Sequence, residues 1–189
     1  MTVFQSRPTR YLIQEKHLSL DNRFTITDDA GNIHYKVHSL FFAMGDKLII
    51  SDANGNELMK IRQDSLHFHL TYKLISTHSG ATARQIASIK RTGPLWQHKL
   101  EIDSSNGKYI LQKQGGVSSD DFTLTKDDVT IAVVARDASP MKNLYWVDII
   151  DSKEQDHTFI LAIVIVLSCA QRLPVNPISK PQVNAPKTD

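Results

Sequence analysis

Apolar and polar residues alternate along most of the first 150 positions of the chain. Ile33, Tyr35 and Val37 alternate with polar neighbours, and Phe24 and Ile26 do the same one run earlier. A period of two buries one face of a strand and leaves the other in water, which is typical of antiparallel sheets. Twelve such runs predict about twelve strands, near residues 10–15, 23–28, 33–38, 47–52, 57–62, 67–75, 84–91, 97–102, 108–113, 121–126, 129–135 and 144–151.

Turn residues separate these runs. Asn54-Gly55 and Asn106-Gly107 each stand between two alternating runs, and this dipeptide tolerates the positive φ angles that tight hairpins require. No long linker or shift in composition divides the strands, so residues 1–173 are expected to form a single, mainly β domain.

One segment breaks the alternation. Residues 159–170 form a run of twelve without a charge, and this length favours a helix although several members are β-branched. Ser152 and Gln155 have the spacing of a capping box, while Arg172 and Pro174 supply a stop. The pattern predicts a helix near residues 153–172 that is apolar on every side and must therefore be buried all round.

This helix is too short to span a membrane. Twelve residues rise about 18 Å, whereas the hydrocarbon core of a bilayer is about 30 Å thick. The other large apolar surface is the inner faces of the strands, and a barrel of about twelve strands encloses more space than its own side chains fill. We therefore expect a closed antiparallel β-barrel around a C-terminal hydrophobic α-helix.

Composition narrows the function classes. Lys and Arg number 22 against 20 Asp and Glu, a formal charge of +2, which gives no electrostatic case for a nucleic-acid partner. The single cysteine, Cys169, and a polar N-terminus without a signal-peptide pattern favour a cytoplasmic location. A protein at this location can also associate peripherally with a membrane. Residues 174–189 hold four of the seven prolines and are expected to be a disordered tail.

The order of elements, twelve strands followed by an all-apolar helix, resembles the tubby C-terminal fold and its relatives, the phospholipid scramblases and the LURP-one-related proteins. The likeness is greatest to the LURP-one-related family and covers about residues 5–173. The residues that carry it are Tyr35–Ser39, Gly45–Ile50, Asp52–Gly55, Ile61–Gln63, His67-Phe68, Tyr72 and the closing helix. The resemblance implies a non-enzymatic binding protein without catalytic residues or a cofactor.

The resemblance also implies a site. Tubby proteins bind phosphatidylinositol bisphosphate through basic residues that include a Lys-x-Arg pair ahead of a Gly-x-Lys strand. Lys36-x-His38 holds the similar place ahead of Gly45-x-Lys47. His38 stands where the tubby pattern has arginine, whose guanidinium is always charged and can bond two oxygens at once. Strand 57–62 adds Lys60 and Arg62. The predicted face for lipid headgroups or other anions is thus Lys36, His38, Lys47, Lys60 and Arg62, and the alternative is a solvated strand face.

Other chemistry has weaker patterns. His67 and His69 share a strand face and, with His34 and His38, make a four-histidine zinc site conceivable, although outward polar positions explain the same spacing. Residues 52–57 mimic the start of a calcium loop, but Gln63 stands where that loop needs glutamate, so a turn is expected. A partner protein, with the chain as scaffold, and a small-molecule or metal-dependent enzyme without a recognisable motif stay open as alternatives.

Overall fold

The structure is a computed structural model. It describes residues 8–16, 23–40, 47–64, 70–77, 82–94, 97–115, 120–137, 143–150 and 153–172. The predicted strand positions 67–69 and the predicted tail, 174–189, lie outside these residues.

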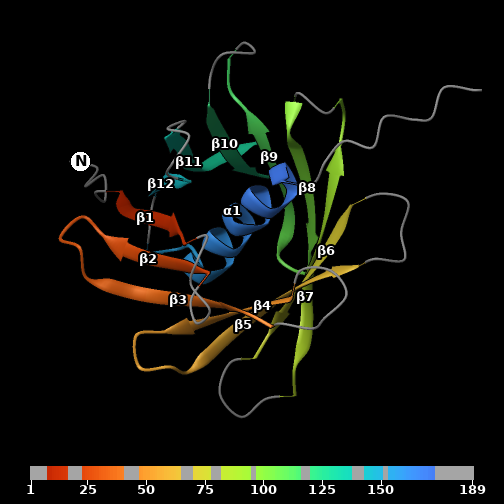
Figure 1. The fold of residues 1–189 in the computed structure, drawn as a ribbon. Helices are drawn as coiled ribbons and strands as arrows, with labels where there is room; N and C mark the ends of the chain where they lie inside the picture. The colour runs from red at the N-terminus through yellow and green to blue at the C-terminus, as the bar shows by residue number, and fades with distance from the viewer. Residues whose placement is uncertain are drawn as a thin grey trace, which may run out of the picture.

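Twelve antiparallel strands form a closed barrel in which each strand pairs with its neighbours in sequence and the first pairs with the last (Figure 1). The strands are β1 (Thr9–Glu15), β2 (Phe24–Asp28), β3 (Ile33–Ser39), β4 (Lys47–Asp52), β5 (Glu57–Asp64), β6 (Thr71–Ser76), β7 (Arg84–Thr92), β8 (Lys99–Ser104), β9 (Gly107–Lys113), β10 (Asp121–Lys126), β11 (Val129–Asp137) and β12 (Leu144–Ile149). Closure leaves no free sheet edge. The predicted fold class is confirmed.

The start of β8 differs from the sequence-based prediction. The alternation placed this strand at 97–102, whereas it runs from Lys99 to Ser104. His98 has a φ of 45°, in the left-handed region that a strand cannot contain. The ladder with β7 therefore begins only at Lys99.

Two hairpins repeat each other with a period of 24 residues. Asp28, Gly31 and Asn32 of the β2–β3 turn correspond to Asp52, Gly55 and Asn56 of the β4–β5 turn, and both glycines have positive φ angles, 83° and 90°. In each hairpin the register slips by one residue just before the turn, after Ile26 and after Ile50. The β6–β7 hairpin slips after Leu74, again 24 residues on. These bulges bend the strands where the barrel curves.

Helix α1 (His157–Arg172) runs through the middle of the ring of strands (Figure 1). Every residue from Phe159 to Ala170 is buried, against the inward side chains of the barrel strands. The all-round apolar run therefore packs inside the barrel, as the alternation and the length of the run predicted. Over the described residues, no helix combines the length and the hydropathy that a membrane span requires.

The helix begins later than predicted. Its first residue is His157 rather than one near 153, and its cap is Asp156, whose Oδ1 accepts a hydrogen bond of 3.0 Å from the amide of Phe159. Gln155 of the predicted capping box precedes the helix, and Ser152 lies outside the described residues. Asp156 caps because its side chain reaches a free amide of the first turn.

Side chains hold both ends of α1. At the start, the hydroxyl of Tyr11 lies 2.9 Å from Nδ1 of His157. At the end, Nη1 of Arg91 donates a hydrogen bond of 3.2 Å to the carbonyl oxygen of Ala170. The last carbonyl groups of a helix have no hydrogen-bond donor within the helix and carry partial negative charge. A guanidinium at this end supplies both a donor and a positive charge.

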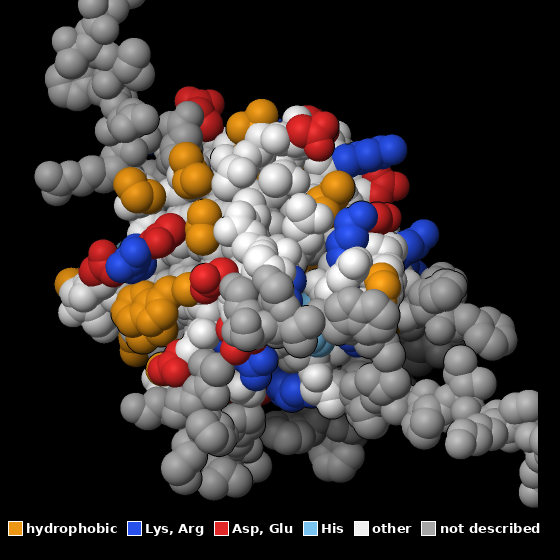
Figure 2. Space-filling view, turned by 90° about the horizontal axis from the view of Figure 1, so that it is seen from above, with side chains coloured by type: hydrophobic (Ala, Val, Ile, Leu, Met, Phe, Trp, Pro, Cys, Tyr) orange, Lys and Arg blue, Asp and Glu red, His pale blue; other side chains and the backbone are white. Residues whose placement is uncertain are grey.

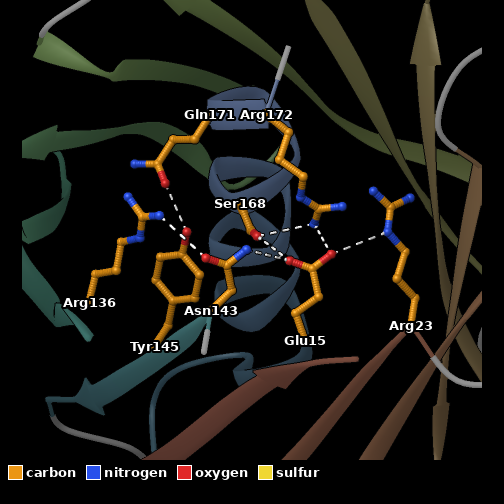
Figure 3. A network of polar contacts seen from close by, with 8 residues as sticks. All are labelled: Glu15, Arg23, Arg136, Asn143, Tyr145, Ser168, Gln171 and Arg172. Atoms are coloured by element: carbon orange, nitrogen blue, oxygen red, sulfur yellow. Dashed lines mark hydrogen bonds and ion pairs between the residues drawn. The ribbon is translucent and has the colours of Figure 1, made fainter. Parts of the chain in front are cut away.

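A buried carboxylate also contacts the last turn of the helix (Figure 3). The side chain of Glu15 on β1 is only 2% exposed, and it forms an ion pair with Arg172 and a longer one, 3.7 Å, with Arg23. Nδ2 of Asn143 donates a hydrogen bond of 3.0 Å to the same carboxylate, and the hydroxyl of Ser168 lies 3.5 Å from it. The carboxylate therefore ties α1 to β1 and to the start of β12.

A second chain of contacts continues from this network across the end of the helix. Nη2 of Arg136 donates to Oδ1 of Asn143 at 3.3 Å, and the hydroxyl of Tyr145 donates to Oε1 of Gln171 at 2.8 Å. Burial raises the pKa of the Tyr145 phenol, which keeps the hydroxyl protonated as this hydrogen bond requires. Figure 3 shows both chains converging on the last turn of α1.

A charge in the helix should unfold the protein. Val164 is fully buried, so Val164→Asp places an unpaired carboxylate inside the barrel and should cost at least about 4 kcal/mol of unfolding free energy. Val129→Asp is the matched control, because Val129 is 66% exposed. Melting followed by circular dichroism should show loss of the folded state for Val164→Asp alone. Equal melting curves for the two variants would contradict a buried helix.

Removing the buried carboxylate should loosen the end of the helix. Glu15→Ala removes the carboxylate that Arg172 and Arg23 face, and it should lower the unfolding free energy by about 2 to 3 kcal/mol. This loss is smaller than the loss expected when one partner of a fully buried ion pair is removed, because Arg172 can be hydrated. Glu57→Ala removes a surface pair with Lys60 and should change the unfolding free energy by less than about 0.5 kcal/mol. Urea denaturation measures both, and similar effects would contradict the anchoring role of Glu15.

Candidate anion-binding face

The five basic residues of the predicted site lie on three neighbouring strands. Lys36 and His38 are on β3, Lys47 is on β4, and Lys60 and Arg62 are on β5. Their neighbours in sequence Val37, Leu48 and Ile61 are buried, and successive side chains of a strand point to opposite faces. The barrel therefore brings all five to its outer surface.

The register sets these cations directly opposite one another. Lys47 on β4 pairs with Arg62 on β5, and Arg62 pairs with Lys73 on β6. Adjacent strands lie about 4.8 Å apart, so three cations span about 10 Å. In the next row His38 pairs with Ile49, and Ile49 pairs with Lys60. We call Lys36, His38, Lys47, Lys60, Arg62 and Lys73 the basic face.

Nearby acids neutralise only part of this charge. Nζ of Lys60 lies 3.1 Å from Glu57, and Nζ of Lys73 lies 2.8 Å from Asp64. Among the described residues, no ion pair involves Lys36, Lys47 or Arg62. Like charges directly opposite each other on neighbouring strands destabilise a sheet. The row Lys47–Arg62–Lys73 therefore retains an excess of positive charge that an anion would relieve.

The hairpin repeat explains why two basic pairs share this surface. Lys36 and His38 stand 24 residues before Lys60 and Arg62, at equivalent positions of the repeated strands. The second copy carries arginine where the first carries histidine. Sequence reasoning missed Lys73, although its place between Tyr72 and Leu74 in an alternating run marks it as outward. What the sequence alone lacked was the register that sets it beside Arg62.

Aliphatic side chains are interleaved with the basic ones. Ile49 and Ile75 are half-buried and lie in the row of Lys60, and Leu40, beside Lys47, is 49% exposed. Seen from above, the barrel shows basic and acidic side chains intermingled, with hydrophobic groups between them (Figure 2). With a total charge of only +2, positive charge on this protein is a local feature of particular faces.

The histidines that the structure describes are not part of a zinc-like cluster. His34 is the extra residue of the β2–β3 bulge, its Nε2 lies 2.9 Å from Asp28, and its ring packs edge-on against Tyr11. His38 is on the outer face, and His67 and His69 lie outside the described residues. In the described part of the chain, no three His, Cys, Asp or Glu side chains cluster closely enough to hold a metal ion.

The aspartates of the β2–β3 and β4–β5 turns accept hydrogen bonds from their own turns. Oδ1 of Asp52 accepts hydrogen bonds of 2.9 Å from the amides of Asn54 and Asn56, and Nδ2 of Asn56 donates to Oδ2. Asp28 makes the same contacts one repeat earlier. Hydrogen bonds from these asparagines lower the pKa of both carboxyls. The resemblance of residues 52–57 to a calcium loop is thus explained by a turn.

Three comparisons agree with this architecture. The LURP-one-related family model matches residues 9–168. Protein LURP-one-related 15 of Arabidopsis thaliana is 29% identical over 97 residues, which are 51% of this chain and 44%, less than half, of that relative. An X-ray structure of an Arabidopsis thaliana protein aligns with 89% of this chain and 95% of its own, with a TM-score of 0.62 at 19% identity. The chain belongs to the LURP-one-related family.

Proposed function

We propose that this protein is a non-enzymatic binding protein whose basic face contacts anionic phospholipid headgroups. The observation that supports the proposal most is the row Lys47–Arg62–Lys73, three cations on directly opposed positions of adjacent strands. Such a row is unfavourable in isolation and becomes favourable when phosphate groups lie across it. Ser168 and Cys169 are buried in the helix, where neither side chain is accessible as a nucleophile, and this supports binding over catalysis.

The side-chain types suit a phosphate-bearing surface. Arg62 presents a planar fork that bonds two phosphate oxygens at once, while Lys47 and Lys73 act as point charges on flexible stems. The neighbouring Leu40 and Ile49 provide apolar surface beside the charges. An anionic membrane attracts each nearby basic residue by about 1 kcal/mol, and this attraction weakens as salt shortens the Debye length.

Charge reversal in the row tests the proposal. Lys47→Glu with Arg62→Glu lowers the formal charge from +2 to −2, because each change removes two units. Binding to vesicles that contain phosphatidylserine or phosphatidylinositol bisphosphate, measured by co-sedimentation, should fall at least roughly a hundredfold. Wild-type binding should weaken with rising salt.

Lys108→Glu with Lys153→Glu is the matched control. Both lysines are exposed and lie outside the basic face, and the double change alters the formal charge by the same amount. This variant should keep more than half of the wild-type binding. Equal losses in the two variants would show that only total charge matters, and undiminished binding of the Lys47 and Arg62 variant would contradict the proposed face.

A second candidate function, a protein-interaction scaffold, is favoured by an exposed tryptophan. Trp146 on β12 is 38% exposed and pairs with Leu12 on β1 and with Ala135 on β11. The guanidinium of Arg10 lies 5.9 Å from its ring centroid and bonds Asp148. A tryptophan within an apolar strip and beside an arginine has the composition of a protein-binding hot spot.

Trp146→Ala tests this second function without disturbing the basic face. Affinity capture with the wild-type chain should retain at least one protein that the Trp146→Ala chain loses, because a buried tryptophan at an interface centre contributes 2 kcal/mol or more, about thirtyfold in affinity. Ile33→Ala, at an exposed apolar position on β3, is the control. Identical sets of captured proteins for all three chains would contradict the scaffold function.

A further inference from the structure

A cavity opens at the end of the barrel where α1 begins, opposite the end that holds the Glu15 network. Its volume is about 270 Å³, and it lies between the ends of β6, β7, β8 and β9 and the residues that lead into the helix. Pockets for drug-sized ligands usually exceed about 300 Å³. This one therefore fits a ligand of about one ring.

The inner part of the cavity is apolar. Tyr109 on β9 and Phe159 on α1 lie with ring centroids 5.1 Å apart, and Ile86 and Ile160 complete this part of the lining. Tyr109 and Phe159 are 6% and 7% exposed, so each presents only a small part of its ring. The other lining residues are polar or charged, so this cavity is more polar than most small-molecule sites.

Uncharged polar side chains surround this apolar part. Ser76, Ser105, Asn106 and Gln155 all line the cavity. Within the described chain, none of these four side chains makes a hydrogen bond with another residue. Asn and Gln each offer donors and an acceptor, and a serine hydroxyl does both. The lining can therefore satisfy a ligand whose groups also donate and accept.

The charges around the cavity disfavour an ionic ligand. A helix N-terminus attracts anions, but here Asp156 already occupies the amide of Phe159, and Glu154 adds a second carboxylate. An aromatic face attracts cations, but Nζ of Lys126 already lies 5.6 Å from the ring centroid of Tyr109. Each kind of charged ligand thus meets a group that repels it.

We infer that this cavity binds a small neutral polyhydroxy compound, a single sugar ring or a cyclic polyol. C–H groups of such a ring can contact the exposed parts of Tyr109 and Phe159, while its hydroxyls bond Asn106, Gln155 and the carboxylate of Glu154. Each hydroxyl can donate to a carboxylate and accept from an amide or from Lys126, so one ligand class satisfies the whole lining. This site is separate from the basic face.

Titration of the full chain with glucose, ribose and myo-inositol tests the inference. Two-dimensional NMR follows the side-chain amide resonances of Asn106 and Gln155. These resonances should shift in a saturable way with at least one of the three compounds. Acetate and methylammonium, as charged comparators, should give no saturable shift. Absence of saturation with all three polyols, or equal saturation with a comparator, would overturn the inference.

Variants locate the binding. Asn106→Ala and Gln155→Ala should each weaken the affinity roughly fivefold, as expected for one lost hydrogen bond, and Ser76→Phe should abolish binding by filling the cavity. Asn54→Ala changes the same residue type in another hairpin turn, outside the cavity, and should leave the affinity unchanged. Melting curves check that each variant is folded. Unchanged affinity in folded Asn106→Ala, Gln155→Ala and Ser76→Phe chains would place the binding elsewhere and contradict the site.

Discussion

The burial of one all-apolar helix inside a closed sheet is the constraint on which this structure depends. Residues 159–170 have no polar side of the helix to turn to water, and twelve strands closed on themselves leave a centre that needs filling. Each part therefore requires the other. The inward side chains of all the strands and the helix form one hydrophobic core, so the barrel and the helix should fold as a single cooperative unit.

Because the helix fills the interior of the barrel, the surfaces that we propose for binding lie on the outside and at one end of the barrel. The end where α1 finishes is occupied by the buried network around Glu15. The end where α1 starts retains a cavity. On the outer surface, the 24-residue hairpin repeat places one basic pair on β3 and one on β5, on either side of β4. The register aligns Arg62 of the second pair with Lys47 and Lys73. The basic face is made of side chains that the core does not use, whereas the cavity shares Tyr109 and Phe159 with the core.

Much of the fold is predictable because local chemistry and global architecture agree. Asn54-Gly55 and Asn106-Gly107 indicated hairpins, the alternating runs indicated strands, and the length of the apolar run required a filled barrel. The start of the helix was missed because capping depends on which side chain reaches the first-turn amides, and the side chain of Asp156 does so. The outward positions of Lys36 and Arg62 followed from alternation, whereas the contact of Glu15 with Arg172 joins residues 157 apart and has no local pattern.

Native-state hydrogen exchange along α1 tests the central role of the helix most directly. If the helix and the barrel are one unit, amides from Ile160 to Leu167 should exchange only through global unfolding, with the same free energy and denaturant dependence as amides of β5 and β12. Exchange of the helix amides through a smaller opening, while the strands stay protected, would show that the barrel stands without its helix and would contradict the account.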